Sequence, residues 1–155
     1  MKDISSIDSN FKVDTKIEKS DIRFYDVKES PFQIYGVFYE AGLFRRMPED
    51  VAKNVSPRVH ALHSNTAGGR VRFTTDSPYV AIYAKMPHIG KMGHFALSGS
   101  AGFDLYVQYE EPRYIKTFIP PFSIADGYES ILEFDSCQMR QITSTFPLYS
   151  DVSER

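Results

Sequence analysis

The alternation of apolar and polar residues with a period of two is the feature that most constrains how this chain can fold. It is clearest from Phe103 to Tyr109, where the odd-numbered residues are apolar or aromatic, and it recurs in the segments 69–75 and 80–86. Successive side chains of a strand point to opposite faces, so this period indicates strands that are buried on one face only. Such strands are typical of antiparallel sheets.

Five further segments carry a weaker strand pattern: 32–38, 57–63, 113–119, 128–134 and 139–147. Clusters of Gly, Pro, Asn, Asp and Ser lie between the segments and mark turns. Only Pro48 to Asn54 looks helical, because a proline at a first-turn position is followed by two acidic residues. The pattern of about nine short strands predicts an all-β fold, namely an antiparallel β-sandwich of the jelly-roll type, with a closed barrel as the alternative.

Length and composition set the expected domain organisation. The 155 residues fit one domain, and the 42% of hydrophobic residues suffice for a sizeable core. The 12 Phe and 10 Tyr residues also favour β structure. The N-terminal part is rich in Lys, Asp and Ser, so we expect residues 1–20 to be a flexible lead-in and residues 21–155 to be a single β-sandwich domain.

Charge and hydrophobic patterning argue against several classes of protein. The formal net charge of −2 argues against nucleic acid or a membrane as the main partner. No run reaches the ~18 apolar residues that a membrane helix needs. Residues 1–10 lack the apolar core of a secretion signal, so we expect a cytoplasmic protein. Cys137 is the single cysteine, so it cannot form an internal disulfide, and we expect it to be a buried packing residue.

Two segments are similar to serine-hydrolase motifs, but their context argues against catalysis. Ser98–Gly102 is similar to a G-x-S-x-G nucleophile elbow around Ser100, and Thr75–Pro78 is similar to a G-D-S-L block around Ser77. The elbow requires a helix after the serine, whereas a strand pattern follows each segment. No D-x-x-H pair near the C-terminus supplies an acid and a base. We therefore expect a glycine-rich turn and a hairpin turn, respectively.

The histidines do not form a metal-binding pattern. His60 and His63 are three positions apart on an expected strand, so their side chains would point to opposite faces. His88 and His94 flank a glycine-containing loop with no cysteine or carboxylate between them. We accordingly predict no catalytic residue, no metal site and no cofactor.

Polar residues on the solvent faces of the clearest strands are the remaining candidates for a site. Arg72 and Asp104 both lie on such faces and would form a structural pair if their strands were neighbours. We predict a polar cluster of Arg72, Asp104, Tyr106 and His94 with either a binding or a structural role. Exposed tyrosines beside polar groups suit a sugar-binding platform, although a plain polar strand face is the commoner arrangement.

Several blocks of the sequence, taken in order, resemble one known family. The blocks are Arg46–Pro48, Val59–Ser77, Met92–His94, Gly102–Tyr106 and Phe146–Val152. Gly102–Tyr106 is similar to the G-x-D-L-Y signature of the N-terminal domain attached to SGNH-type, or GDSL-like, esterases. The resemblance covers about residues 30–152, which is most of the chain.

The resemblance implies a jelly-roll sandwich that precedes a separate α/β catalytic domain. That second domain would hold the catalytic serine, the oxyanion hole and the Asp-x-x-His pair. His60 stands where the family pattern often has Trp, so no aromatic role is carried over to that position. The sequence ends at Arg155, where a final strand would be expected. The chain would then be either a truncated copy or a natural stand-alone domain.

Three hypotheses about function follow from these patterns. The first is a non-catalytic N-terminal accessory domain of an SGNH-type hydrolase acting on acylated carbohydrate, which supports or shapes the active site of a following catalytic domain. The second is a carbohydrate-binding module with a face of tyrosines: Tyr79, Tyr83, Tyr106 and Tyr109. The third is a homo-oligomerisation domain without enzyme activity, in which exposed apolar surface forms a homodimer.

Overall fold

Antiparallel strands make up most of the chain, and the computed structural model describes residues 15–153. The largest sheet has five strands in the order β1-β4-β9-β6-β7. Its strands are β1 (Gln33–Tyr35), β4 (Arg70–Thr75), β9 (Arg140–Thr145), β6 (Phe103–Gln108) and β7 (Pro112–Phe118). Two smaller sheets pair β5 (Tyr79–Lys85) with β8 (Gly127–Glu133), and β2 (Phe38–Glu40) with β3 (Leu43–Arg45). The described part thus has nine short strands, which confirms the predicted antiparallel β fold.

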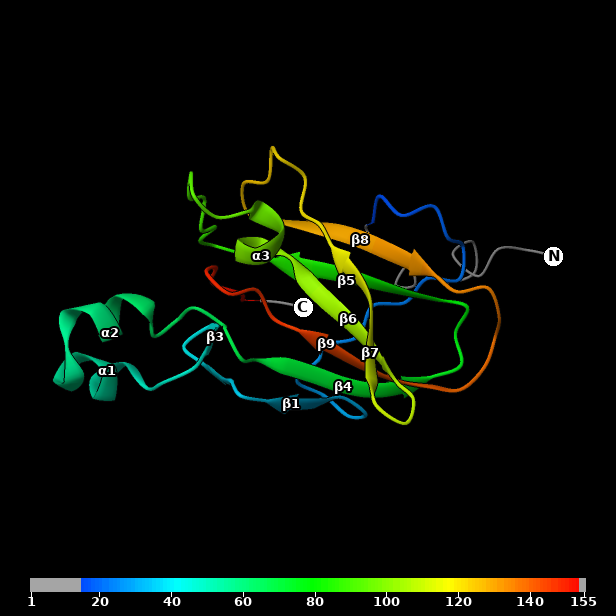
Figure 1. Cartoon of the computed structure of the whole chain (residues 1–155), viewed down its shortest axis with the longest axis horizontal. Helices are drawn as coiled ribbons and strands as arrows, with labels where there is room; N and C mark the ends of the chain where they lie inside the picture. The colour runs from blue at the N-terminus through cyan, green and yellow to red at the C-terminus, as the bar shows by residue number, and fades with distance from the viewer. Residues whose placement is uncertain (1–14, 154–155) are drawn as a thin grey trace, which may run out of the picture.

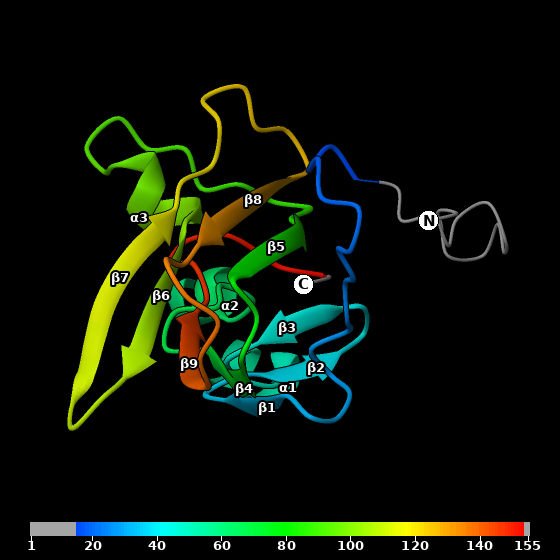
Figure 2. The same ribbon diagram turned by 90° about the vertical axis from the view of Figure 1, so that its right-hand side faces the viewer.

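The β5–β8 pair lies against one side of the five-stranded sheet, and the two sheets share one core (Figure 1, Figure 2). Val71 on β4, Leu105 on β6 and Ile142 on β9 are at most 1% exposed. They pack in the same apolar cluster as Ile82 and Ala84 of β5. In the three clearest strands the alternation therefore identified the residues of the core.

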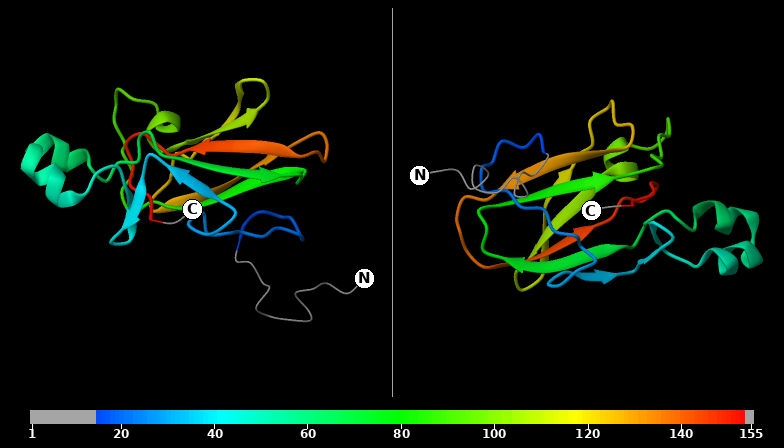
Figure 3. Two further views of the ribbon diagram at one scale, coloured as in Figure 1. Left: turned by 90° about the horizontal axis from the view of Figure 1, so that it is seen from below. Right: turned by 180° about the vertical axis from the view of Figure 1, so that it is seen from behind.

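Within residues 15–153, three short helices interrupt the strands: α1 (Glu49–Val55), α2 (Pro57–Leu62) and α3 (Leu97–Ala101). The structure confirms the helix predicted near Pro48, but the strand expected over 57–63 is wrong, because this segment forms α2. Ser56 Oγ accepts a hydrogen bond from the backbone N–H of Val59 at 3.2 Å. A serine N-cap followed by proline in the first turn starts a helix, and these signals outweigh the weak alternation. α1 and α2 project from one end of the sheets (Figure 3).

Two connections also differ from the sequence expectation. β1 ends at Tyr35 because Gly36 adopts a φ of 75°, and a Cβ at Gly36 would lie 2.3 Å from the carbonyl oxygen of Gly68. The segment 32–38 is therefore two strands rather than one. The turn Thr75–Pro78 is not a hairpin, because β4 pairs with β1 and β9 whereas β5 pairs with β8. This turn carries the chain from one sheet to the other.

The peripheral segments bear on three further expectations. Cys137 is exposed in the turn between β8 and β9, so the expected buried packing role is wrong. Of the predicted lead-in, residues 1–14 lie outside the described residues, while Thr15 Oγ1 donates a hydrogen bond to Glu129 Oε2 on β8 at 2.6 Å. In the described part of the chain, every helix is too short or too polar to cross a membrane.

Adjacent residues of β9 test the assignment of the two faces. Ile142 is 0% exposed in the shared core, whereas Gln141 is exposed on the opposite face. We expect Ile142→Ala to lower the free energy of unfolding by about 2–5 kcal/mol, because it removes buried methyl groups and leaves a cavity. Gln141→Ala should change it by less than about 0.5 kcal/mol. Urea denaturation monitored by circular dichroism measures both values, and equal losses would contradict the assignment.

Candidate functional site

The outer face of the five-stranded sheet carries three of the four residues predicted as a polar cluster. Thr143 on β9 pairs with Arg72 on one side and with Tyr106 on the other, so the three residues form one row across the sheet. Directly opposed residues of antiparallel strands point to the same face. Asp104 precedes Tyr106 by two positions and shares this face. His94 lies in the loop before α3, outside this row.

Arg72 and Asp104 are not the neighbouring structural pair that we considered, because β9 lies between their strands. Asp104 Oδ1 instead accepts a hydrogen bond from Thr117 Oγ1 of β7 at 2.5 Å. The backbone N–H of Asp104 also donates to Thr145 Oγ1 of β9 at 3.3 Å. The aspartate is thus bonded to side chains from the strands on both sides of β6. Arg72 instead contacts the ring of Tyr35.

Tyr35 forms one end of this face, and the sequence analysis did not identify it. The Cζ atoms of Arg70 and Arg72 lie 5.4 Å and 5.3 Å from the centroid of the Tyr35 ring. The Tyr35 hydroxyl donates a hydrogen bond to Gln33 Oε1 at 2.8 Å, which fixes the ring along the sheet edge. Only the register that sets Tyr35 opposite Arg70 brings these side chains together.

A second pair of aromatic residues forms the other end of the outer face. The rings of Tyr106 and Tyr114 lie 5.8 Å apart in an edge-to-face arrangement, and Tyr114 is 53% exposed. The Tyr114 and Thr117 hydroxyls are hydrogen-bonded at 2.9 Å. The pairing of β6 with β7 shifts its register between Leu105 and Tyr106, which sets Tyr114 opposite Tyr106. Strict alternation over 113–119 would instead have placed Tyr114 on the same face as the buried Phe118, so no local pattern identified it.

The four tyrosines expected to form a binding face do not gather on one surface. Tyr79 and Tyr83 lie on β5 in the other sheet, and Tyr109 follows the end of β6. The Tyr79 hydroxyl donates to Asp21 Oδ1 at 2.8 Å, so it holds the segment before β1. Burial raises the pKa of Tyr79 to about 12, and the hydrogen bond to Asp21 adds to this rise. Of the four, only Tyr106 lies on the face described above.

The block Gly102–Tyr106 has a structural explanation at each position. A Cβ at Gly102 would lie 2.1 Å from the carbonyl oxygen of Ser98, so the close approach of β6 to α3 requires glycine. Phe103 and Leu105 are 0% exposed and contribute to the core. Asp104 and Tyr106 reach the outer face. Asp104 accepts a hydrogen bond from Thr117 of β7, and Tyr106 packs on Tyr114.

Ser100 is not a surface nucleophile. The segment that we expected to be a glycine-rich turn forms α3, and Ser100 is 0% exposed within it. Its Oγ lies 3.4 Å from the carbonyl oxygen of Leu97, to which it donates a hydrogen bond. Its own carbonyl oxygen accepts hydrogen bonds from Ser150 Oγ at 2.8 Å and from the backbone N–H of Tyr149 at 3.2 Å. These contacts join α3 to the C-terminal segment.

Buried and half-buried polar residues from two of the family-like blocks and from α3 meet at this end of the molecule. We call Asn65, Thr66, Ser100, Ser150 and Asp151 the C-terminal polar cluster. Thr66 Oγ1 is 0% exposed and lies 2.9 Å from the carbonyl oxygen of Pro147 and 3.3 Å from that of Ser150. Asn65 Nδ2 donates to Asp151 Oδ1 at 3.1 Å. These contacts of Thr66 and Asn65, like those of the Ser100 carbonyl oxygen, tie the C-terminal segment to other parts of the chain, so they serve the structure.

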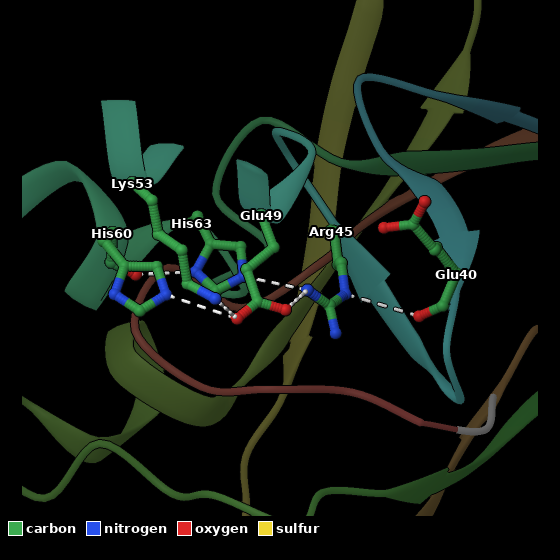
Figure 4. Close-up of polar contacts among 6 residues, drawn as sticks. All are labelled: Glu40, Arg45, Glu49, Lys53, His60 and His63. Carbon is green, nitrogen blue, oxygen red and sulfur yellow. Dashed lines mark hydrogen bonds and ion pairs between the residues drawn. The ribbon is translucent and has the colours of Figure 1, made fainter. Parts of the chain in front are cut away.

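A charged cluster on the projecting helices was also missed by the sequence analysis (Figure 4). Glu49 Oε1 lies 2.7 Å from Lys53 Nζ and 3.4 Å from His60 Nε2, and Glu49 Oε2 lies 3.5 Å from Arg45 Nη1. The rings of His60 and His63 stack at 5.1 Å, because His63 caps the C-terminus of α2 in helical geometry, three positions after His60. The strand-based expectation that these two histidines point apart is therefore wrong.

The hydrogen bonds of His63 define the protonation of its ring. His63 Nδ1 lies 2.6 Å from the carbonyl oxygen of His60, and His63 Nε2 lies 2.9 Å from Arg45 Nη1. An arginine can only donate, so Nε2 accepts, and we assign the neutral ring with its proton on Nδ1. The hydrogen bond from Lys53, followed by that from His60, lowers the pKa of Glu49 to about 2. In residues 15–153, no group of three or more His, Cys, Asp or Glu residues is arranged to hold a metal ion.

Two hollows lie beside β5. An open groove of about 990 Å³ runs along the outer side of the β5–β8 pair, where residues 16–19 and Ser153 line its rim. A smaller hollow of about 300 Å³ lies between β4 and β5 under residues 21–27, and apolar side chains such as Phe73 and Leu105 line it.

Comparisons with known proteins place the chain in a family. The family model for the GxDLY N-terminal region of SGNH-hydrolase-type esterases matches residues 22–154. A GDSL-like lipase from Bacteroides ovatus ATCC 8483 has a similar fold, with a TM-score of 0.72 and 20% identity, over 84% of this chain and 38% of the lipase chain. The salicylyl-acyltransferase SsfX3 from a tetracycline biosynthetic pathway gives a TM-score of 0.57 and 21% identity, over 84% of this chain and 37% of that chain. No curated protein matches the sequence.

The Thr66 hydroxyl should be important for stability. Thr66→Val keeps the shape of the side chain but leaves the carbonyl oxygens of Pro147 and Ser150 without this donor. We expect a loss of about 1–3 kcal/mol in the free energy of unfolding, because buried acceptors then lack a partner. Thr74→Val on the exposed face of β4 is the matched control and should have little effect. Thermal and urea denaturation compare the two, and a neutral Thr66→Val would show that the cluster is dispensable.

The charged cluster should make a stabilising contribution that is lost in acid. The pKa of Glu49 is lowered from 4.5 to about 2 in the folded chain, so the ionised form is favoured by folding. This contribution is complete above pH 4.5 and disappears as the pH falls through 2. Carboxyl chemical shifts measured by NMR should show the low pKa, and Lys53→Gln should raise it because the largest favourable contact is removed. An unchanged midpoint in Lys53→Gln would contradict the assignment.

Proposed function

The chain belongs to the GxDLY N-terminal family of SGNH-hydrolase-type esterases, and from this we propose that it is a non-catalytic accessory domain that supports or shapes the active site of a separate SGNH-type catalytic domain. The observation that carries the proposal is the extent of the matches. The family model covers residues 22–154, whereas the chain spans only 38% and 37% of the two solved proteins. In those relatives the catalytic domain lies elsewhere in the chain.

The chemistry of the described residues supports a non-catalytic role. Ser100 is enclosed and bonded within the structure, and Ser77 lies in the turn between the sheets. His60 contacts Glu49, but no serine or cysteine hydrogen-bonds to its ring among residues 15–153. A hydroxyl without a base to take its proton is a poor nucleophile. The proposed domain therefore has a carboxylate–imidazole contact without the third component that acyl transfer needs.

We also propose a fold type for the domain and a substrate for its catalytic partner. The shared core of the five-stranded sheet and the β5–β8 pair supports a sandwich of the jelly-roll type, with residues 21–155 as one domain. One solved relative is named a lipase and the other a salicylyl-acyltransferase, so acyl transfer is the chemistry that their names share. An acylated carbohydrate is the substrate that we propose for the partner domain. The cytoplasmic location stays a prediction.

Homo-oligomerisation is a second candidate because of the loop between β7 and β8. Ile119 is 64% exposed and Phe122 is 94% exposed in this loop. Large apolar side chains that are this exposed often mark a contact surface. The same loop could instead meet the catalytic domain, so light scattering of this chain and of the two-domain protein would separate the alternatives.

The accessory role is tested by comparing the chain with the full reading frame of its gene. We expect this chain to hydrolyse p-nitrophenyl acetate no faster than buffer, and the frame extended beyond codon 155 to encode a strand followed by a catalytic serine and to be active. Ser100→Ala is the control, and it should leave the activity of the extended protein in place. Robust hydrolysis by this chain that disappears in Ser100→Ala would overturn the proposal, as would a gene that ends directly after codon 155.

A further inference from the structure

We propose that the outer face of the five-stranded sheet binds an acidic carbohydrate, that is, a glycan whose sugar rings carry carboxylate groups. Arg70 and Arg72 bind the carboxylates, while Tyr106 and Tyr114 pack against the sugar rings. This binding site goes beyond the accessory role, because it requires neither a catalytic domain nor an acyl group on the ligand. In Figure 2 this sheet curves from β7 to β1, and no helix lies over its outer side.

The charge of the face favours an anionic ligand. Register and alternation place two positively charged side chains on it, Arg70 and Arg72, and one carboxylate, Asp104. That carboxylate is engaged by Thr117 at 2.5 Å. Neither arginine forms an ion pair with another residue of the described part of the chain. The face is thus positive in a chain whose formal net charge is −2.

Tyr35 orients the two guanidinium groups without neutralising them. Their Cζ atoms lie 5.4 Å and 5.3 Å from its ring centroid, so both contact the same aromatic ring. A cation–π contact uses the flat face of the guanidinium and leaves its edge N–H groups able to donate. Those edge groups match a carboxylate in a bidentate arrangement. The arginines are exposed or half-buried, so a ligand reaches them.

The tyrosine pair supplies the surface for a sugar ring at the other end. Tyr114 is 53% exposed and its ring is held against Tyr106 and its hydroxyl against Thr117. Aromatic faces pack on the C–H groups of sugars, and hydroxyls bond the sugar oxygens. β9 separates β4 from β6, and β7 follows β6, so the arginines of β4 lie about 10 Å from Tyr106 and about 14 Å from Tyr114, at two and three strand spacings. A ligand that reaches both ends is at least a disaccharide, and the Thr143 hydroxyl lies between them.

Other polyanions fit this face less well. Nucleic acid binding relies on several phosphate contacts, and two arginines supply too few. An extended peptide would add to the free edge of a sheet through its backbone, whereas the arginines and tyrosines point away from the sheet plane. A carbohydrate uses the charge and the exposed rings together.

The proposal is tested by isothermal titration of this chain with acidic oligosaccharides. The ligands are tetragalacturonate, an alginate oligomer and hyaluronan, and methyl-esterified tetragalacturonate is the uncharged match of the first. We expect at least one acidic oligosaccharide to bind with a dissociation constant below about 1 mM at moderate salt, and the esterified form to bind at least ten-fold more weakly. Arg70→Gln with Arg72→Gln should weaken binding at least ten-fold, and Tyr114→Ala should weaken it several-fold.

Two controls decide whether the face itself is responsible. Arg23→Gln with Arg58→Gln removes the same two positive charges from exposed positions away from this face and should leave the affinity unchanged. Polyglutamate reports attraction by charge alone and should bind at least ten-fold more weakly than the oligosaccharide. The proposal would be overturned if none of the three acidic oligosaccharides bound at a ligand concentration of about 5 mM, which is five times the expected upper limit of about 1 mM for the dissociation constant. Equal losses in the two arginine pairs, or polyglutamate binding as tight as the sugar, would also overturn it. None of these results bears on whether a catalytic domain follows this chain.

Discussion

The anchoring of the C-terminal segment 146–153, in which Phe146, Ser150 and Val152 are buried, is the constraint on which the rest of the structure depends. Phe146 lies in the core with its ring 5.0 Å from Phe44 and 6.1 Å from Phe103, so it joins β3 to β6. Val152 is 0% exposed, and its carbonyl oxygen accepts from the backbone N–H of Phe44 at 2.9 Å. Where such an irregular segment is buried, its backbone polar groups need partners. α3, β3 and the loop after β5 supply those partners.

This requirement explains why several parts of the family-like sequence meet at one end of the molecule. Gly90 approaches the C-terminal segment so closely that a Cβ would lie 2.1 Å from the carbonyl oxygen of Tyr149. Thr66 and Ser100 bond the same segment with a hydroxyl and a carbonyl oxygen, respectively. The serine that is similar to a nucleophile is thus one of the groups that satisfy a buried backbone. Its own side chain is enclosed and donates to Leu97 within α3, which is the opposite of what a nucleophile needs.

The same packing separates the molecule into an end that is held internally and a sheet face that is left open. The inner face of the five-stranded sheet is used by the core, and its outer face carries polar and aromatic side chains that need no partner to be stable in water. Asp104 shows the difference, because its backbone belongs to the core strand while its carboxylate faces outward and bonds Thr117. A domain of this kind can keep a structural core while its outer face adapts to a ligand or to a partner domain.

The sequence by itself determined which residues face inward, because a period of two is a local property of strands. Leu105 and Ile82 could be assigned to the core in this way, and the mismatch of Ser100 with a nucleophile elbow could be argued from the strand that follows it. The sequence could not settle whether the segment 57–63 is a strand or a helix, because the N-cap at Ser56 competes with a weak alternation.

Strand order and register were decided only in three dimensions. β9 separates Arg72 from Asp104, and β1 brings Tyr35 to Arg70. The residues that form these contacts are distant in sequence, so no local pattern records which strand lies beside which. The tertiary structure therefore decided the site, because pairing between strands depends on how the whole core packs.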